Sequence, residues 1–209
     1  MIGRSVQPLA PPDRRAVRAT PRPAAQNLTP GASIAARYLV SVADVALRVP
    51  DPDHLVHLQF RRFAGCPVCN LHLRSIVRRH TEITAAGIRD VVVFHSSAAD
   101  LRPHVADLPF DVLADPSKQL YIAFGVESSP RALLDPRVWL PIARGVAHSL
   151  WDLLSGRQPA PPLTPRGGRL GLPADFLIAP DGRLLASKYG THAYDQWSVD
   201  ELLTLARSA

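Results

Sequence analysis

The chain has 209 residues, of which 46% are hydrophobic and 20% charged, a composition that can fill a globular core. Most of the formal net charge of +6 lies in residues 1–30, where five arginines face one aspartate, so the remainder is nearly neutral. That remainder shows no basic stripe interleaved with aromatic residues, and no apolar run of 18 residues occurs. We therefore expect neither a nucleic-acid partner nor a membrane span.

Residues 1–33 contain six prolines and scattered arginines without apolar periodicity, which predicts a disordered tail. A transit peptide is an alternative for an arginine-rich start, but the prolines would break its amphipathic helix. The first residues lack the apolar segment of a secretory signal. With the chain's two cysteines in one Cys-x-x-Cys motif, this predicts a cytoplasmic protein with a cycling dithiol.

Strands and helices then alternate. A hairpin is predicted from residues 37–42 and 45–49, and a turn from residues 50–53. Residues 55–63 are rich in strand formers and predict a strand. A helix is expected from Pro67 to Gly87, with Arg78 and Glu82 paired across one turn. Residues 90–95 predict a buried strand. A helix that is capped by Ser96 or Ser97 should then run to Val105. Residues 110–113 predict a further strand, and residues 115–125 predict a helix. This order predicts an α/β fold with a parallel core.

The region 126–171 interrupts this alternation. Apolar residues at helical spacing from Val138 to Leu154 predict an amphipathic helix of about five turns that ends at Gly156. We expect its apolar face to pack on the flank of the sheet; the alternative is a dimer contact or a lid anchored by Trp139 and Trp151. Residues 158–171 are rich in proline and glycine and predict a mobile loop.

The last segment predicts a hairpin and a helix. Residues 171–178 and 183–187 flank a Pro-Asp-Gly turn at 180–182. A helix should then run from Ser198 to Ala206, since Ser198 and Glu201 have the spacing of a capping box. His192, Asp195 and Trp197 lie between these elements and are explained by capping and packing.

The two cysteines lie where a predicted strand meets a predicted helix. Pro67 suits the first helical turn, which places Cys66 at the amino end of the helix, close to free N–H groups. This environment favours the thiolate of Cys66, the reactive form. Cys69 lies one turn further on, within reach of a disulfide with Cys66.

Two other interpretations of the pair remain open. Zinc could take Cys66, Cys69 and a histidine such as His72 or His80, but no second ligand pair follows at the spacing of a zinc ribbon. A structural disulfide would close so short a loop that it would remove little chain entropy. Thiol redox chemistry is the interpretation that the pattern favours.

With strand, Cys-x-x-Cys, helix and a late antiparallel hairpin in this order, residues 37–207 resemble the thioredoxin-like fold. The resemblance implies a three-layer α/β sandwich with a central mixed sheet, an N-terminal hairpin and a helical insertion at about 130–170. It implies that one domain spans residues 34–209 behind the tail 1–33. It also implies that Pro173, just before the hairpin, is a cis-proline packed against the cysteines.

More narrowly, Phe60-x-Arg62-x-x-Gly65-Cys66-x-x-Cys69 is similar to the peroxiredoxin-like branch of the AhpC/TSA (alkyl hydroperoxide reductase and thiol-specific antioxidant) superfamily. Residues 91–97, 110–116 and 120–125 resemble further elements of that family. Two positions depart from its pattern. Phe63 stands where typical peroxiredoxins have threonine or serine, and the Pro173 segment stands where they supply an arginine.

The resemblance implies a thiol-dependent antioxidant oxidoreductase in which Cys66 attacks a peroxide and Cys69 resolves the product to a disulfide. Arg62 would lower the pKa of Cys66 or orient the peroxide, or would be a solvated arginine at a strand end. Catalytic residues would be Cys66, Cys69, Arg62 and Pro173, with support from Pro67, His95 and Ser96; His95 is either a proton donor or a loop histidine without a role.

No metal and no cofactor is expected. The partners would be a peroxide or disulfide substrate, a thioredoxin-like or low-molecular-weight thiol reductant, and a second copy in a homodimer. Two alternatives remain: a thioredoxin-type protein disulfide reductase, and a redox-sensing or interaction domain without catalysis. Peroxide consumption, insulin reduction and oxidation-dependent binding would separate these functions.

Overall fold

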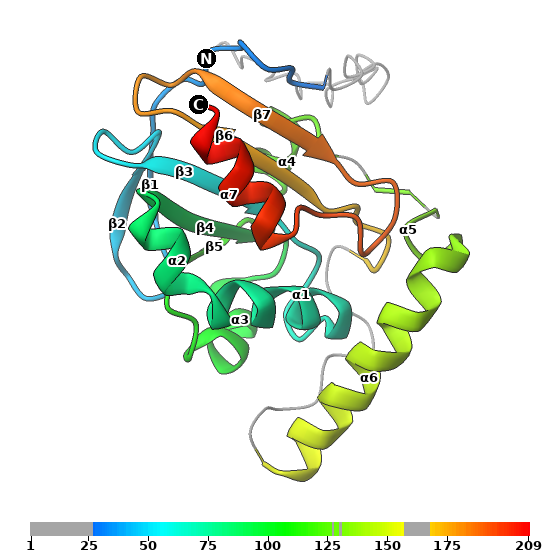
Figure 1. Cartoon of the computed structure of the whole chain (residues 1–209). Helices are drawn as coiled ribbons and strands as arrows, with labels where there is room; N and C mark the ends of the chain where they lie inside the picture. Colours follow the sequence, from blue (N-terminus) through cyan, green and yellow to red (C-terminus); the bar gives the residue numbers. More distant parts are fainter. Residues whose placement is uncertain (1–26, 127, 130, 157–167) are drawn as a thin grey trace, which may run out of the picture.

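The computed structural model describes residues 27–126, 128–129, 131–156 and 168–209. Its centre is a five-stranded mixed sheet with the order β5-β4-β3-β6-β7 (Figure 1). Strands β3 (Leu55–Phe60), β4 (Ile88–Phe94) and β5 (Asp111–Ala114) are parallel, as the alternation of strands and helices predicts. The antiparallel hairpin of β6 (Ala174–Ile178) and β7 (Leu184–Tyr189) continues the sheet from the other edge of β3.

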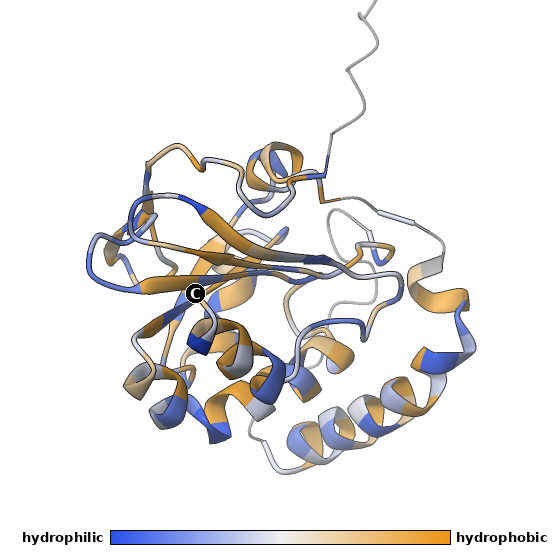
Figure 2. Cartoon of the chain, turned by 45° about the horizontal axis from the view of Figure 1, so that its top comes forward, coloured by the Kyte–Doolittle hydropathy of each residue, from blue (hydrophilic) through white to orange (hydrophobic). Residues whose placement is uncertain are grey.

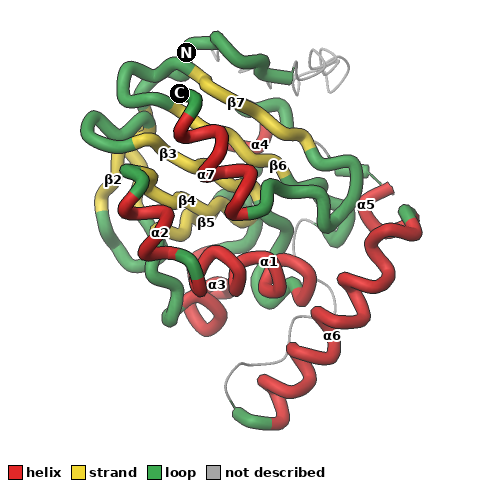
Figure 3. Tube along the Cα trace, in the orientation of Figure 1, coloured by secondary structure: helices red, strands yellow, loops and turns green. Residues whose placement is uncertain are grey.

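A separate hairpin, β1 (Arg37–Val40) with β2 (Ala46–Val49), precedes the sheet. The helices complete the fold (Figure 3): α1 (Pro67–Arg78), α2 (His80–Ala85), α3 (Ala98–Val105), α4 (Gln119–Ala123), α5 (Arg131–Leu134), the short 3₁₀ helix η1 (Pro136–Val138), α6 (Trp139–Leu154) and α7 (Val199–Arg207). The helical insertion, α5 to α6, lies between α4 and β6 as predicted.

The alternation of side chains along the strands divides the core into two layers. On one face Val56, Leu58 and Phe60 of β3 pack with Tyr121 and Phe124 around α4. The other face is covered by α1, α2, α3 and α7, with separate apolar clusters around the cysteines and around α7. This three-layer arrangement, around strands that are largely hydrophobic (Figure 2), confirms the predicted α/β sandwich.

Local capping chemistry explains where several helices begin. Ser97, not Ser96, caps α3, and Ser198 and Glu201 form both hydrogen bonds of the predicted capping box of α7. Asp115 accepts hydrogen bonds from the backbone N–H groups of Gln119 and Leu120 and so holds the start of α4.

The single helix expected from Pro67 to Gly87 is two helices, because the backbone leaves helical geometry at Arg79. The guanidinium of Arg79 bonds Glu82 and also Asp200 at the start of α7. The prediction that Arg78 pairs with Glu82 is therefore wrong, because the arginine that pairs with Glu82 is its neighbour Arg79. The end of α1 at Arg79 thus coincides with a contact between residues far apart in the sequence, Arg79 and Asp200.

Helix α6 does not pack on the flank of the sheet, so the favoured prediction for it is wrong. Its partner is α1: the backbone of Gly145 lies directly against the carbonyl group of Pro67, and Arg74 of α1 pairs with Asp152 of α6. Only a glycine allows so close an approach at position 145. The opposite face keeps its apolar side chains exposed, with Trp139 at 63% and Trp151 at 64%.

One further expectation needs correction. Residues 27–33 are not part of a disordered tail: they pair with the β6–β7 hairpin through Gly31 N–H to the Leu184 carbonyl and Leu184 N–H to the Ala32 carbonyl. Residues 1–26 lie outside the described residues, as does 157–167 of the predicted mobile loop. Across the described segments, every helix is too short or too polar to cross a lipid bilayer.

Candidate functional site

The dithiol lies at the amino end of α1, at the carboxyl end of β3. Cys66 is the N-cap of α1, and its sulfur accepts a hydrogen bond from the Cys69 backbone N–H at 3.4 Å. The two sulfurs lie 2.6 Å apart and are joined by a hydrogen bond from the Cys69 thiol. Both cysteines are free thiols, so the structure shows the reduced pair. Pro67 occupies the first helical position, as the sequence predicts.

Both thiols are buried, with residue exposures of 1% for Cys66 and 2% for Cys69. They share an apolar cluster with Phe63 and with residues of the insertion, among them Val138 and Ile142. The loop after β7 joins the same cluster, and its Ala193 N–H bonds the Ala132 carbonyl of α5. The insertion therefore covers the dithiol in this conformation.

The two thiols have very different acidities because they are coupled. Burial raises the pKa of Cys66 well above its ordinary value, and the neighbouring sulfur of Cys69 raises it further. Burial also opposes ionisation of Cys69, but its hydrogen bond with Cys66, the charge of Arg62 and a backbone hydrogen bond of Arg62 bring its pKa down to about 7. The pair thus loses its first proton near neutral pH.

Arg62 is buried beside the pair with 3% exposure, so the alternative of a solvated arginine is wrong. Its guanidinium lies 5.4 Å from the centre of the Phe63 ring and donates a hydrogen bond to the Arg169 carbonyl. Its positive charge favours the ionised form of both thiols. The guanidinium is therefore a buried positive charge near the dithiol that can stabilise an anion there.

The supporting residues from the loop after β4 are also buried. Ser96 Oγ accepts the Ala64 N–H at 3.0 Å and so holds the turn that precedes Cys66. His95 is 1% exposed, its backbone N–H bonds the Arg62 carbonyl, and its ring meets Tyr121 edge to face at 5.9 Å. His95 is therefore a buried loop residue, and its role as a proton donor stays a prediction.

Pro173 is buried at the start of β6, but it is not the expected cis-proline. Among the described residues the cis peptide bond is that between Val49 and Pro50, and the Leu172–Pro173 bond is trans. Trans is the lower-energy form even before proline, and it lets the extended chain continue into β6. The Pro173 carbonyl accepts the Gly190 N–H at 2.9 Å, so Pro173 closes the β6–β7 end of the sheet.

The histidines considered as zinc ligands have other partners. His72 Nε2 lies 3.2 Å from Arg61 Nη2, and His80 Nδ1 lies 3.8 Å from a carboxylate oxygen of Asp90. Within the part of the chain that the structure describes, no three histidine, cysteine or acidic side chains form a group that could hold a metal ion.

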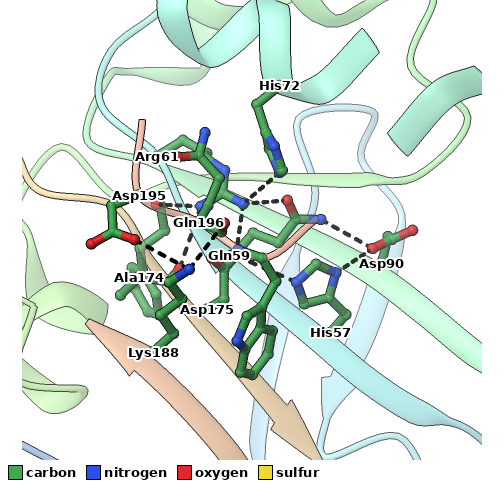
Figure 4. A network of polar contacts seen from close by, with 12 residues as sticks. His57, Gln59, Arg61, His72, Asp90, Ala174, Asp175, Lys188, Asp195 and Gln196 are labelled. Carbon is green, nitrogen blue, oxygen red and sulfur yellow. Dashed lines mark hydrogen bonds and ion pairs between the residues drawn. The ribbon is translucent and has the colours of Figure 1, made fainter. Parts of the chain in front are cut away.

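A buried polar network beside the dithiol was missed by the sequence analysis (Figure 4). Its members lie on three strands, on α1 and just after β3: His57, Gln59, Arg61, His72, Asp90 and Asp175. The signal was present, because His57, Gln59 and Arg61 alternate with apolar residues and so face one side of a strand. That side is covered by helices, which the sequence pattern of the strand alone does not reveal.

The chain is similar to a known enzyme family. A family model described as AhpC/TSA antioxidant enzyme matches residues 75–192, more than half of the chain, in a segment that begins after the two cysteines. No curated protein matches the chain.

Among solved structures, a peroxidoxin BcpB from Mycobacterium tuberculosis is similar with a TM-score of 0.62 and 16% identity, over 87% of this chain and 98% of that one. A cysteine-to-serine mutant of peroxiredoxin 6 from Arenicola marina has a TM-score of 0.61 and 18% identity, over 87% and 73% of the two chains. A putative thiol:disulfide interchange protein DsbE from Chlorobium tepidum has a TM-score of 0.55 and 17% identity, over 86% and 99%. These likenesses establish the fold.

Proposed function

The chain belongs to the AhpC/TSA antioxidant enzyme family, as its motifs indicate, and on this premise we propose that it is a thiol peroxidase in which Cys66 attacks and Cys69 resolves. A thiol-dependent redox function follows from the family. The observation that carries the finer proposal is the hydrogen-bonded sulfur pair at the start of α1, beside a buried arginine.

The chemistry begins from the Cys66 thiol and the Cys69 thiolate. The Cys66 proton passes to Cys69 across the 2.6 Å contact, so Cys69 acts as the local base. The Cys66 thiolate then attacks one peroxide oxygen and breaks the O–O bond, which gives a sulfenic acid and an alkoxide. The alkoxide takes its proton back from Cys69 and leaves as an alcohol.

Resolution needs no large movement. The Cys69 thiolate attacks the Cys66 sulfenic acid, forms the disulfide and expels hydroxide. The dithiol loses two electrons in all, and the peroxide gains them. A thiol reductant of low molecular weight or a thioredoxin-like protein returns the pair to the dithiol by exchange.

Burial of both sulfurs favours a peroxide over a protein disulfide as substrate. A protein disulfide reductase must bring its first sulfur into contact with a disulfide on another protein, and neither cysteine is exposed enough for this. A hydroperoxide is small, and the same reasoning favours a low-molecular-weight thiol as reductant. We also propose that the protein acts in the cytoplasm, since its dithiol must be reduced again after each turnover.

The test is consumption of hydrogen peroxide or an alkyl hydroperoxide with dithiothreitol as the reductant. We expect activity in the wild type and none in Cys66→Ser. Cys69→Ser should form a trappable sulfenic acid on Cys66 but slow the turnover. Insulin reduction provides the comparison: fast insulin reduction without peroxide consumption would contradict the proposal and favour the reductase alternative.

A further inference from the structure

The polar network of Figure 4 is connected through one guanidinium nitrogen. Arg61 Nη2 lies 2.7 Å from Asp175 Oδ1, 2.7 Å from Gln59 Oε1 and 3.2 Å from His72 Nε2. Because this nitrogen is a donor only and carries two N–H bonds, its three neighbours are all acceptors, and two of them share one N–H. His72 therefore presents an unprotonated Nε2, in agreement with a pKa that burial and the charge of Arg61 lower well below the ordinary value.

His57 lies between the two carboxylates of the network. Its Nδ1 is hydrogen-bonded to Asp90 Oδ1 at 2.7 Å, whereas its Nε2 lies at ion-pair distance from Asp175 Oδ1, 3.4 Å, without a hydrogen bond. Because a carboxylate accepts and does not donate, an imidazole with a carboxylate on each side is best satisfied as the doubly protonated imidazolium. Burial alone would lower the pKa of His57, but the two carboxylates outweigh it and raise the pKa above its ordinary value.

The buried charges then balance. With His57 protonated, Arg61 and His57 carry two positive charges, and Asp90 and Asp175 carry two negative ones. Every one of these side chains is at most 1% exposed. Such a layer is costly to desolvate unless it is paired, and it offers little net stability over apolar packing. Its presence next to a reactive pair points to a role in the chemistry of that pair.

The network reaches the dithiol through α1 and through Arg61. His72 lies on α1 one turn after Cys69, so its contact with Arg61 fixes the first turns of that helix against the sheet. The charge of Arg61 also contributes to the lowered pKa of Cys69, together with Arg62. Asp175 binds the same guanidinium that acts on the sulfur.

We propose that Arg61 and Asp175 are positioning residues that act on the ionisation of the dithiol in opposite directions. Arg61 favours the thiolate, and Asp175 opposes it. Arg61 supplies a positive field at Cys69, Asp175 restrains that field, and the buried His57 imidazolium keeps the whole layer neutral. This inference rests on the proposed use of the dithiol as a nucleophile, but it concerns the ionisation of the sulfurs and not their substrate.

The charged and titratable groups that face the participants lie on every neighbouring element. Cys69 is influenced by Cys66 on its own helix, by Arg61 and Arg62 after β3, and by Tyr121 of α4, whose own pKa is raised by burial and by the charge of Cys69. The charge of Lys188 of β7 also acts on His72. None of these groups binds Arg61 as directly as Asp175 does.

The experiment measures thiolate absorbance in the ultraviolet during pH titration of the reduced protein, which requires no peroxidase activity. Arg61→Gln should raise the midpoint of the first ionisation by about one pH unit, and Asp175→Asn should lower it by a similar amount. The double variant R61Q/D175N should return close to the wild type. Opposite shifts that cancel are not expected from loss of packing alone.

Arg61→Lys keeps the charge and should restore most of the wild-type midpoint, so the proposal stays testable if Arg61→Gln folds poorly. Arg89→Gln is the matched control, because Arg89 also pairs with two aspartates, Asp51 and Asp111, but outside this network. The ring carbon shifts of His57 should show an imidazolium at pH 7 in the wild type.

Equal shifts of the same sign in folded R61Q and D175N, or unchanged midpoints in both, would overturn the proposal. So would a neutral His57 at pH 7 in the wild type. Peroxide consumption is recorded in parallel. An inactive wild type whose midpoints shift as expected would contradict the peroxidase function and leave the electrostatic role of the pair intact.

Discussion

The contact between α6 and α1 depends on the missing side chain of Gly145, which makes Gly145→Ala a sharp perturbation. An added Cβ would stand 2.7 Å from the Pro67 carbonyl oxygen and 2.9 Å from its carbonyl carbon. Both atoms belong to the backbone of the turn that follows Cys66. No side-chain rotation relieves the clash, so the variant should push α6 away from α1.

Two effects of opposite sign decide the result. Alanine in place of glycine inside a helix stabilises by about 0.5–1 kcal/mol. Overpacking against a fixed neighbour costs about 1–3 kcal/mol. Because the neighbour is backbone, we expect the clash to prevail and the free energy of unfolding to fall by about 1 kcal/mol. If the closed form, in which the insertion covers the dithiol, loses the same free energy of about 1 kcal/mol, the population with an exposed dithiol rises about five-fold.

The assay follows reaction of the reduced protein with 5,5′-dithiobis(2-nitrobenzoate), together with urea denaturation. Gly145→Ala should react about five-fold faster than the wild type and unfold at lower urea concentration. His148→Ala, on the exposed face of α6, is the control and should change neither quantity. A Gly145→Ala protein that is more stable, with unchanged thiol reactivity, would refute the covering role of α6.

Three further predictions concern ionisation and stability. Since the pKa of Cys69 is about 7 and only thiolates react, alkylation by iodoacetamide should accelerate as pH rises from about 6 to about 8; a midpoint at the ordinary thiol value of about 8.5 would contradict this. Gly87→Ala should cost about 1 kcal/mol for its positive φ alone. Gly182→Ala should cost more, because its Cβ would also lie 2.9 Å from the Ile34 carbonyl oxygen; equal costs in urea denaturation would contradict that contact. Ser198→Ala should remove about 1 kcal/mol by loss of the capping box, read as a lower melting temperature, and no change would refute the cap.

Local sequence signals account for much of the fold. The strands, the Pro-Asp-Gly hairpin and the position of Cys66 at the start of a helix follow from periodicity, turn residues and Pro67, each of which acts within a few residues. The structure agrees with these predictions because the tertiary contacts reinforce the local preferences.

The predictions that failed, and the features that were missed, depend on contacts between residues far apart in the sequence. The break at Arg79 involves Asp200, and the docking of α6 depends on Gly145 meeting Pro67, neither of which a pattern within one helix can show. The Arg61–Asp175 pair joins residues 114 positions apart.

The central claim is that Cys66 is a peroxide-reactive nucleophile, and its most direct test is a stopped-flow titration of the reduced protein with hydrogen peroxide. Tryptophan fluorescence follows the reaction, and Cys69→Ser traps the Cys66 sulfenic acid for mass spectrometry. The account predicts a second-order rate far above that of free cysteine and a trapped oxygen on Cys66. A rate equal to that of a free thiol, or oxidation found on Cys69 alone in the wild type, would contradict it.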